Sequence, residues 1–143
     1  MTSTYCYQPL SHKRAIRLIK LHQSLEDDAP LSCNIVETSV DEPEDYYALS
    51  YTWGGEAPSQ RMLIQGHTAS ATSESSASII LVTPNCATAL RKLRKLVQGS
   101  GTGVWVDAVC INQTATEEKS VQVSMMAEIY RHAKSVVIWL GEE

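Results

Sequence analysis

The chain has 143 residues, of which 43% are hydrophobic and 20% charged, and its formal net charge is −4. This length suits one domain or a large part of one, with a hydrophobic core that needs no disulfides or metal ions to stabilise it. The acidic balance gives no positive field to attract nucleic acid or anionic lipid. No apolar run approaches the roughly 20 residues of a membrane span, and no secretory signal opens the chain. We therefore expect a cytoplasmic protein that binds neither nucleic acid nor membrane.

The four cysteines are widely spaced, with no C-x-x-C pair and no partnering pair of histidines. This spacing argues against a zinc site, so we predict no metal site. Free thiols in a reducing compartment are the simplest interpretation.

Residues 1–45 are predicted to form an N-terminal β lead-in that packs on the rest of the domain. Segments 14–21 and 31–40 alternate imperfectly between apolar and polar residues, and an acidic, proline-bearing stretch separates them. That pattern favours two half-buried antiparallel strands. The acidic residues 41–45 then predict a break in the chain.

Residues 46–52 are aromatic and β-prone and lead into Gly54-Gly55, which predicts a central strand followed by a turn. A short run at 61–64 is a further strand candidate. Residues 66–78 are dominated by Ser, Thr and Ala, so we expect a flexible insertion there.

A helix is predicted at 84–97, because Thr83 suits the N-cap, Pro84 suits the first helical position and apolar residues recur on one face. An apolar run at 104–111 predicts a second central strand. Thr114 and Glu117 have capping-box spacing and predict the start of a helix at 115–133.

Residues 135–140 predict a last strand, which completes a βαβ unit. Near-continuous apolar strands joined by helices are typical of parallel sheets. The predicted fold class is therefore α/β, with a partial parallel sheet of strands 46–52, 104–111 and 135–140 and an N-terminal antiparallel β extension. The last strand is uncharged and strongly β-prone, so it would favour association if it were an open edge.

Ligands of parallel sheets bind at the carboxyl ends of the strands. One candidate patch there is Ser50–Gly55, in which Trp53 could stack on a nucleotide while backbone N–H groups near Gly54 bind phosphate. The alternative is that Trp53 is part of the core. No glycine-rich phosphate-loop motif occurs in the chain.

A second candidate patch follows the 104–111 run and contains Asn112, Gln113 and Glu118. Glu118 is either an acid/base group or a favourable charge at a helix N-terminus. Asp107 is either a structural group or part of a site, because a carboxylate within an apolar strand needs a partner.

Two further candidates have simple structural interpretations. Cys110 and His132 could act as nucleophile and base, but a packed thiol and a surface imidazole fit the pattern better. Met125 and Met126 indicate core or interface.

A set of motifs recurs in a fixed order along the chain, at 47–54, 82–85, 89–91, 105–113, 118–119, 122–123, 126, 129–130, 133 and 136–141. Together these motifs resemble the fungal heterokaryon incompatibility (HET) domain. That resemblance implies nonself recognition, cell-death signalling and a flavodoxin/TIR-like parallel sheet that assembles with protein partners or with itself. Some TIR-related proteins cleave NAD, which implies NAD as a substrate bound by the two patches with Glu118 as catalytic group.

One departure from the family pattern bears on the enzymatic hypothesis. Family members usually continue after the Leu140-Gly141 turn into a segment with an Arg-x-Trp and a Gln-Glu pair, which this sequence lacks. We therefore expect the N-terminal portion of a HET domain at 46–143, acting by assembly. An NAD-cleaving enzyme and a gene fragment without function are the alternatives.

Overall fold

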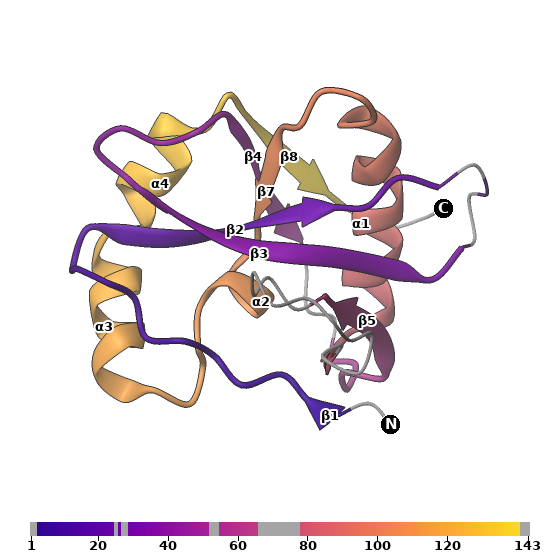
Figure 1. Ribbon diagram of the computed structural model, residues 1–143, viewed down its shortest axis with the longest axis horizontal. Helices are drawn as coiled ribbons and strands as arrows, with labels where there is room; N and C mark the ends of the chain where they lie inside the picture. The colour runs from indigo at the N-terminus through magenta and orange to yellow at the C-terminus, as the bar shows by residue number, and fades with distance from the viewer. Residues whose placement is uncertain (1–2, 25, 27–28, 52–54, 66–77, 141–143) are drawn as a thin grey trace.

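The computed structural model describes residues 3–24, 26, 29–51, 55–65 and 78–140, and its strands form one mixed sheet (Figure 1). Within these residues the strand order is β1-β6-β5-β3-β2-β7-β4-β8. The strands are β1 (Ser3–Thr4), β2 (Ala15–Leu21), β3 (Leu31–Ser39), β4 (Tyr46–Tyr51), β5 (Gln60–Ile64), β6 (Ser78–Val82), β7 (Gly103–Trp105) and β8 (Ser135–Trp139). The helices are α1 (Pro84–Leu96), α2 (Asp107–Cys110), α3 (Thr116–Ser124) and α4 (Met126–His132).

The predicted parallel arrangement of the three core strands is confirmed. β4 lies between β7 and β8 and runs parallel to both. Figure 1 shows α1 on one side of these strands and α3 and α4 on the other. On the α4 side, the hydroxyl of buried Tyr46 donates to the carbonyl of Ile129. On the α1 side, Trp139 Nε1 donates to Asn85 Oδ1 at 2.9 Å.

The predicted antiparallel pair at the N-terminus is also confirmed, with Leu18 opposite Val36. β2 continues into the sheet on its other edge, where Ile19 pairs with Val104 of β7. Both of these residues are fully buried. β2 and β3 therefore share one sheet with the parallel strands.

The predicted first helix is confirmed, and its start is as expected. Thr83 is the N-cap, and its hydroxyl accepts a hydrogen bond from Cys86 N at 3.1 Å. Pro84 occupies the first turn, where its missing N–H costs nothing. Cys86, Leu90 and Leu93 face the core.

The predicted strand over 104–111 is confirmed at its start, as β7, and was wrong for residues 107–110. The strand ends at Trp105, and residues 107–110 form the short helix α2, in which Cys110 N bonds to Val106 O at 2.8 Å. A buried helical turn is as apolar as a buried strand, so the pattern could not separate the two. Asp107 consequently opens a helical turn, where its charge is favourable.

The prediction of one helix over 115–133 was also wrong, because the helix is divided at Met125. Met125 has φ −99° and ψ 0°, and its N–H bonds to Gln122 O. The expected capping box is absent as well. Ala115 is the N-cap, and the Thr114 hydroxyl bonds to Asn112 Oδ1 at 2.9 Å.

β6 was not predicted, and its first residue, Ser78, belongs to the stretch 66–78 that was expected to be a flexible insertion but is in a strand here. It pairs antiparallel with β5, which confirms the short strand expected near 61–64. Residues 66–77 of the expected flexible insertion lie outside the described residues.

Thr83→Ala removes the cap hydroxyl of α1 and leaves Cys86 N–H buried without its acceptor. We expect the free energy of unfolding to fall by about 1 kcal/mol, measured by urea denaturation. Thr88→Ala is the control, because the Thr88 hydroxyl only donates to Pro84 O within the same helix. An equal loss in both variants would contradict the capping role.

Candidate functional site

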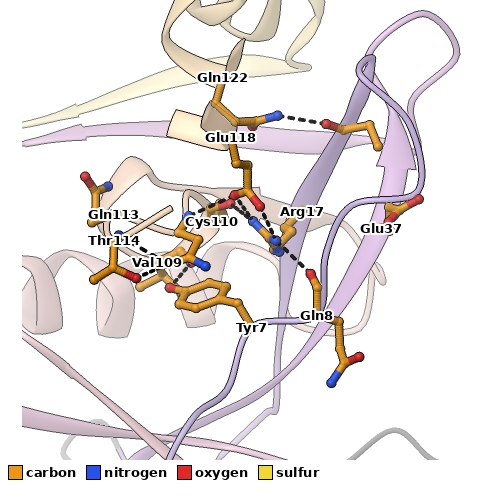
Figure 2. Close-up of polar contacts among 12 residues, drawn as sticks. Tyr7, Gln8, Arg17, Glu37, Val109, Cys110, Gln113, Thr114, Glu118 and Gln122 are labelled. Atoms are coloured by element: carbon orange, nitrogen blue, oxygen red, sulfur yellow. Dashed lines mark hydrogen bonds and ion pairs between the residues drawn. The ribbon is translucent and has the colours of Figure 1, made fainter. Parts of the chain in front are cut away.

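Arg17 is a charged residue inside an apolar strand, only 3% exposed. Its guanidinium forms a bidentate ion pair with Glu118 of α3, with Nη1–Oε2 at 2.6 Å and Nη2–Oε1 at 2.8 Å (Figure 2). The same nitrogens donate to Cys110 O at 3.1 Å and Gln8 O at 2.8 Å. This one side chain therefore joins β2, α2, α3 and the N-terminal segment.

Tyr7 covers the ion pair from the N-terminal side. The Arg17 guanidinium lies over its ring, 4.9 Å from the ring centre, which is a favourable cation–π distance. The Tyr7 hydroxyl donates to Val109 O at 2.6 Å (Figure 2). Tyr7 is thus fixed to α2 by a hydrogen bond, and Gln8 is fixed to β2 through Arg17.

Glu118 is held from both sides. Besides Arg17, the backbone N–H of Asn112 donates to Glu118 Oε2 at 3.1 Å. The hydrogen bonds from Arg17 hold the pKa of the Glu118 carboxyl below its ordinary value. An ionised carboxylate with these partners is well suited to position α3 and Asn112, and poorly suited to donate a proton. Its predicted catalytic role stays a prediction.

Asn112 and Gln113 form the turn between α2 and α3. Asn112 Oδ1 accepts from both Thr114 N and Thr114 Oγ1, at 3.2 and 2.9 Å. Gln113 Nε2 donates to the Asp107 carbonyl at 2.8 Å. These bonds fix the turn next to Glu118, so the second predicted patch is one structural unit.

A pocket of about 400 Å³ opens beside this unit. Two of the predicted site residues, Asn112 and Glu118, line it together with the N-terminal end of α3. Its lining residues are Tyr7, Pro9, Asn112, Ala115, Thr116, Glu117 and Glu118. We take this pocket as the candidate ligand site.

The first predicted patch is located differently. Ser50 lies near the end of β4, in register with Ile138, and its hydroxyl bonds to Tyr130 of α4. It is not among the residues that line the pocket. Trp53 and Gly54 lie outside the described residues.

Asp107 lies on the first turn of α2, half-buried. Burial raises the pKa of its carboxyl, and the N–H of Ala108 and the charge of Lys119 act against that rise. Asp107 interacts electrostatically with Lys119 of α3 and with Tyr130 of α4.

The Cys110 thiol is buried in the core, and burial raises its pKa to about 12. It therefore stays protonated at neutral pH and is a poor nucleophile. His132 lies exposed at the end of α4. The interpretation of Cys110 as a packed thiol agrees with this burial.

Arg17 and Tyr7 were not predicted as site residues. The available signal was Arg17 itself, a charge at an inward position of an apolar strand, which requires a buried partner. The partner could not be identified, because Glu118 is 101 residues away in the chain.

The described part of the chain contains no group of three or more His, Cys, Asp or Glu side chains arranged to hold a metal ion. Among the same residues, no helix has both the length and the apolar character needed to cross a membrane.

Comparison with known proteins gives two matches. The family model of the heterokaryon incompatibility protein (HET) matches residues 46–143. The chain belongs to the HET family. It is also 38% identical, over 130 residues, to heterokaryon incompatibility protein 6, OR allele, of Neurospora crassa. That match covers 88% of the chain but only 18% of the relative, so the chain corresponds to under a fifth of that protein. No solved structure matches significantly.

The HET match begins at Tyr46, whereas Arg17 lies before it and Glu118 within it. Glu118→Ala breaks the pair and leaves Arg17 buried without its counter-charge. We expect a loss of about 3 kcal/mol in the free energy of unfolding. Arg14→Ala is the control, because Arg14 pairs with Asp41 and Glu128 while 40% exposed, and it should cost at most about 1 kcal/mol.

The pair should also give the stability a distinct pH dependence. The pKa of Glu118 is lower in the folded state than its ordinary value of 4.5. The stabilisation is therefore complete above about pH 4.5 and is lost as the pH falls toward the folded-state pKa. Urea denaturation across this range should show a shallower decline in Glu118→Gln, and an unchanged slope would contradict the assignment.

Proposed function

We propose that this HET-family chain acts in fungal nonself recognition and cell-death signalling, in the cytoplasm, through assembly with protein partners or with itself. The observation that carries the proposal is the position of β8 at the edge of the sheet. Among the described strands, β8 is at one end of the sheet and pairs only with β4.

β8 and Leu140, the residue after it, present exposed apolar side chains beside the open edge. Val136 is 42% exposed, Ile138 66% and Leu140 81%. The alternate residues Val137 and Trp139 pack against the core. An uncharged edge strand with an apolar outer stripe is a ready template for pairing with another strand. Self-association through this edge is therefore the form of assembly that we propose.

The flavodoxin/TIR-like kinship is part of the same proposal. In chain order, the parallel strands β4, β7 and β8 are first, second and third, and they lie in the order second, first, third. Flavodoxin-like sheets begin with that order, and their ligands bind at the carboxyl ends where the chain changes direction. The placement of α1 and α4 on opposite faces supports the same topology (Figure 1).

Ile138→Lys places a charge in the middle of the β8 stripe, where pairing would have to bury it. We expect the unsubstituted chain to associate as its concentration rises and Ile138→Lys to remain monomeric, both measured by sedimentation velocity. Leu96→Lys is the matched control, because Leu96 is 55% exposed on α1, away from the edge, and should leave association unchanged. A monomeric unsubstituted chain at every attainable concentration would refute self-association.

Cleavage of NAD is the second candidate function, and the pocket beside Asn112 and Glu118 favours it. Small-molecule sites are mostly apolar with a few polar groups, and the lining of this pocket combines apolar surface with the polar side chains of Asn112, Thr116 and Glu118. Glu118 would there act on the substrate or, as its contacts with Arg17 indicate, position the groups that do.

Chromatographic measurement of NAD consumption tests this function. Because Glu118→Ala also breaks the ion pair, the informative comparison adds Glu117→Ala, which changes the pocket rim without touching Arg17. We expect an enzyme to lose turnover in Glu118→Ala even where both variants are folded by circular dichroism. The absence of turnover in the unsubstituted chain, together with no NAD-induced rise in melting temperature, would dispose of the hypothesis.

A further inference from the structure

Three polar side chains form a hydrogen-bonded chain at the far end of β2 and β3. The ring of His22, the first residue after β2, lies between Ser32 and Asn34 of β3. His22 Nδ1 is 2.7 Å from Ser32 Oγ, and His22 Nε2 is 2.6 Å from Asn34 Oδ1. All three residues are partly exposed, so the group can be reached from solvent.

The contacts of Asn34 determine which ring nitrogen carries the proton. Asn34 Nδ2 donates to the carbonyl of Gln65 at 3.5 Å, which turns Oδ1 toward the histidine. An amide oxygen only accepts, so Nε2 of a neutral His22 is the N–H donor. Nδ1 is then an acceptor, and the hydroxyl of Ser32 donates to it. The hydroxyl of Ser32 therefore donates to the imidazole of His22, and the imidazole donates to the side-chain amide oxygen of Asn34.

The backbone around this group is firmly held. His22 N donates to Ser32 O at 2.9 Å, which closes the end of the strand pair. Arg94 of α1 is only 3% exposed and donates to Pro30 O at 3.2 Å and to Glu26 O at 3.3 Å. The histidine and the serine therefore keep their relative positions without a ligand.

An apolar strip lies next to the serine on the same face of the sheet. Ser32 is in register with Leu63 of β5, and Leu63 is in register with Ile79 of β6. Side chains at paired positions project to the same face. Leu63 and Ile79 are both partly exposed. A short hydrocarbon chain attached at Ser32 could lie along them.

We propose that Ser32 is a nucleophile for acyl transfer, with His22 as its general base and Asn34 as the residue that positions His22. A hydroxyl bonded to a base that a third group orients is the arrangement on which serine hydrolysis depends. The substrate class is an ester with a short apolar acyl group. This activity is independent of assembly through β8.

The chemistry balances with water as the second substrate. Ser32 Oγ bonds to the acyl carbon while His22 Nδ1 takes the hydroxyl proton. The ester C–O bond breaks, and the leaving oxygen takes its electron pair and that proton. A water then attacks the acyl-serine, gives its proton to His22, and releases the carboxylic acid as the proton returns to Ser32.

The test uses the purified chain with a fluorophosphonate probe, which modifies activated serines covalently. Mass spectrometry of proteolytic peptides should place the label on Ser32. Ser32→Ala should abolish labelling, and His22→Gln should slow it about a hundredfold, the lower end of what a positioned general base contributes. Hydrolysis of p-nitrophenyl butyrate should fall in parallel.

Matched control variants distinguish labelling of a serine that is activated by a base from labelling of a serine that is merely exposed. Ser11→Ala and His12→Gln change an exposed serine and an exposed histidine outside the group and should leave labelling unchanged. Asn34→Asp keeps an acceptor oxygen toward Nε2 and should retain labelling, whereas Asn34→Ala should lose it. Label spread over several serines of the unsubstituted chain, or labelling of Ser32 that is insensitive to His22→Gln, overturns the proposal. The peptide map requires no variant, so the test survives a variant that does not fold.

Discussion

Burying the guanidinium of Arg17 is the constraint on which the arrangement around α2 and α3 depends. A desolvated cation is tolerated only where its donors are matched, and Arg17 has Glu118, two backbone carbonyls and the face of Tyr7. These partners come from three other segments, namely α2, α3 and the N-terminal residues 7 and 8. The turn at Asn112, the start of α3 and the path of residues 7 and 8 are therefore mutually dependent. The pocket of about 400 Å³ lies where these segments meet, so its shape depends on the ion pair.

The polar groups of the candidate site fall into two kinds, those that are used in internal hydrogen bonds and those that are exposed to solvent. Glu118 and the Asn112 amide are occupied by internal hydrogen bonds, whereas Glu117 is exposed on the pocket rim. Among the described strands β8 pairs only with β4, so its outer edge has polar backbone groups without a strand partner and apolar side chains beside them. The internally hydrogen-bonded site and the open edge of β8 are the physical reason for proposing assembly ahead of catalysis for this HET-family chain.

Features encoded by neighbouring residues could be predicted from the sequence. Thr83-Pro84 defines the start of α1 locally, and the alternation in β2 and β3 identifies two strands. The apolar run after Gly103 could not be resolved, because a buried helical turn and a buried strand have the same composition. The break at Met125 has no comparable signal in the helical pattern. Asn112 and Glu118 were grouped correctly since six residues separate them, whereas Ser50 lies on another element and Arg17 acts over a hundred positions.

The insertion of β2 between β3 and β7 has a consequence for biosynthesis. During translation β2 and β3 leave the ribosome before residues 103–105, so the β2 edge that later pairs with Val104 has no native partner until those residues emerge. Pairings this distant in the chain form slowly. An unpaired edge in a nascent chain invites contact with other nascent chains or requires a chaperone. Yield in a cell should therefore respond to translation speed and chaperone supply more than the final stability suggests.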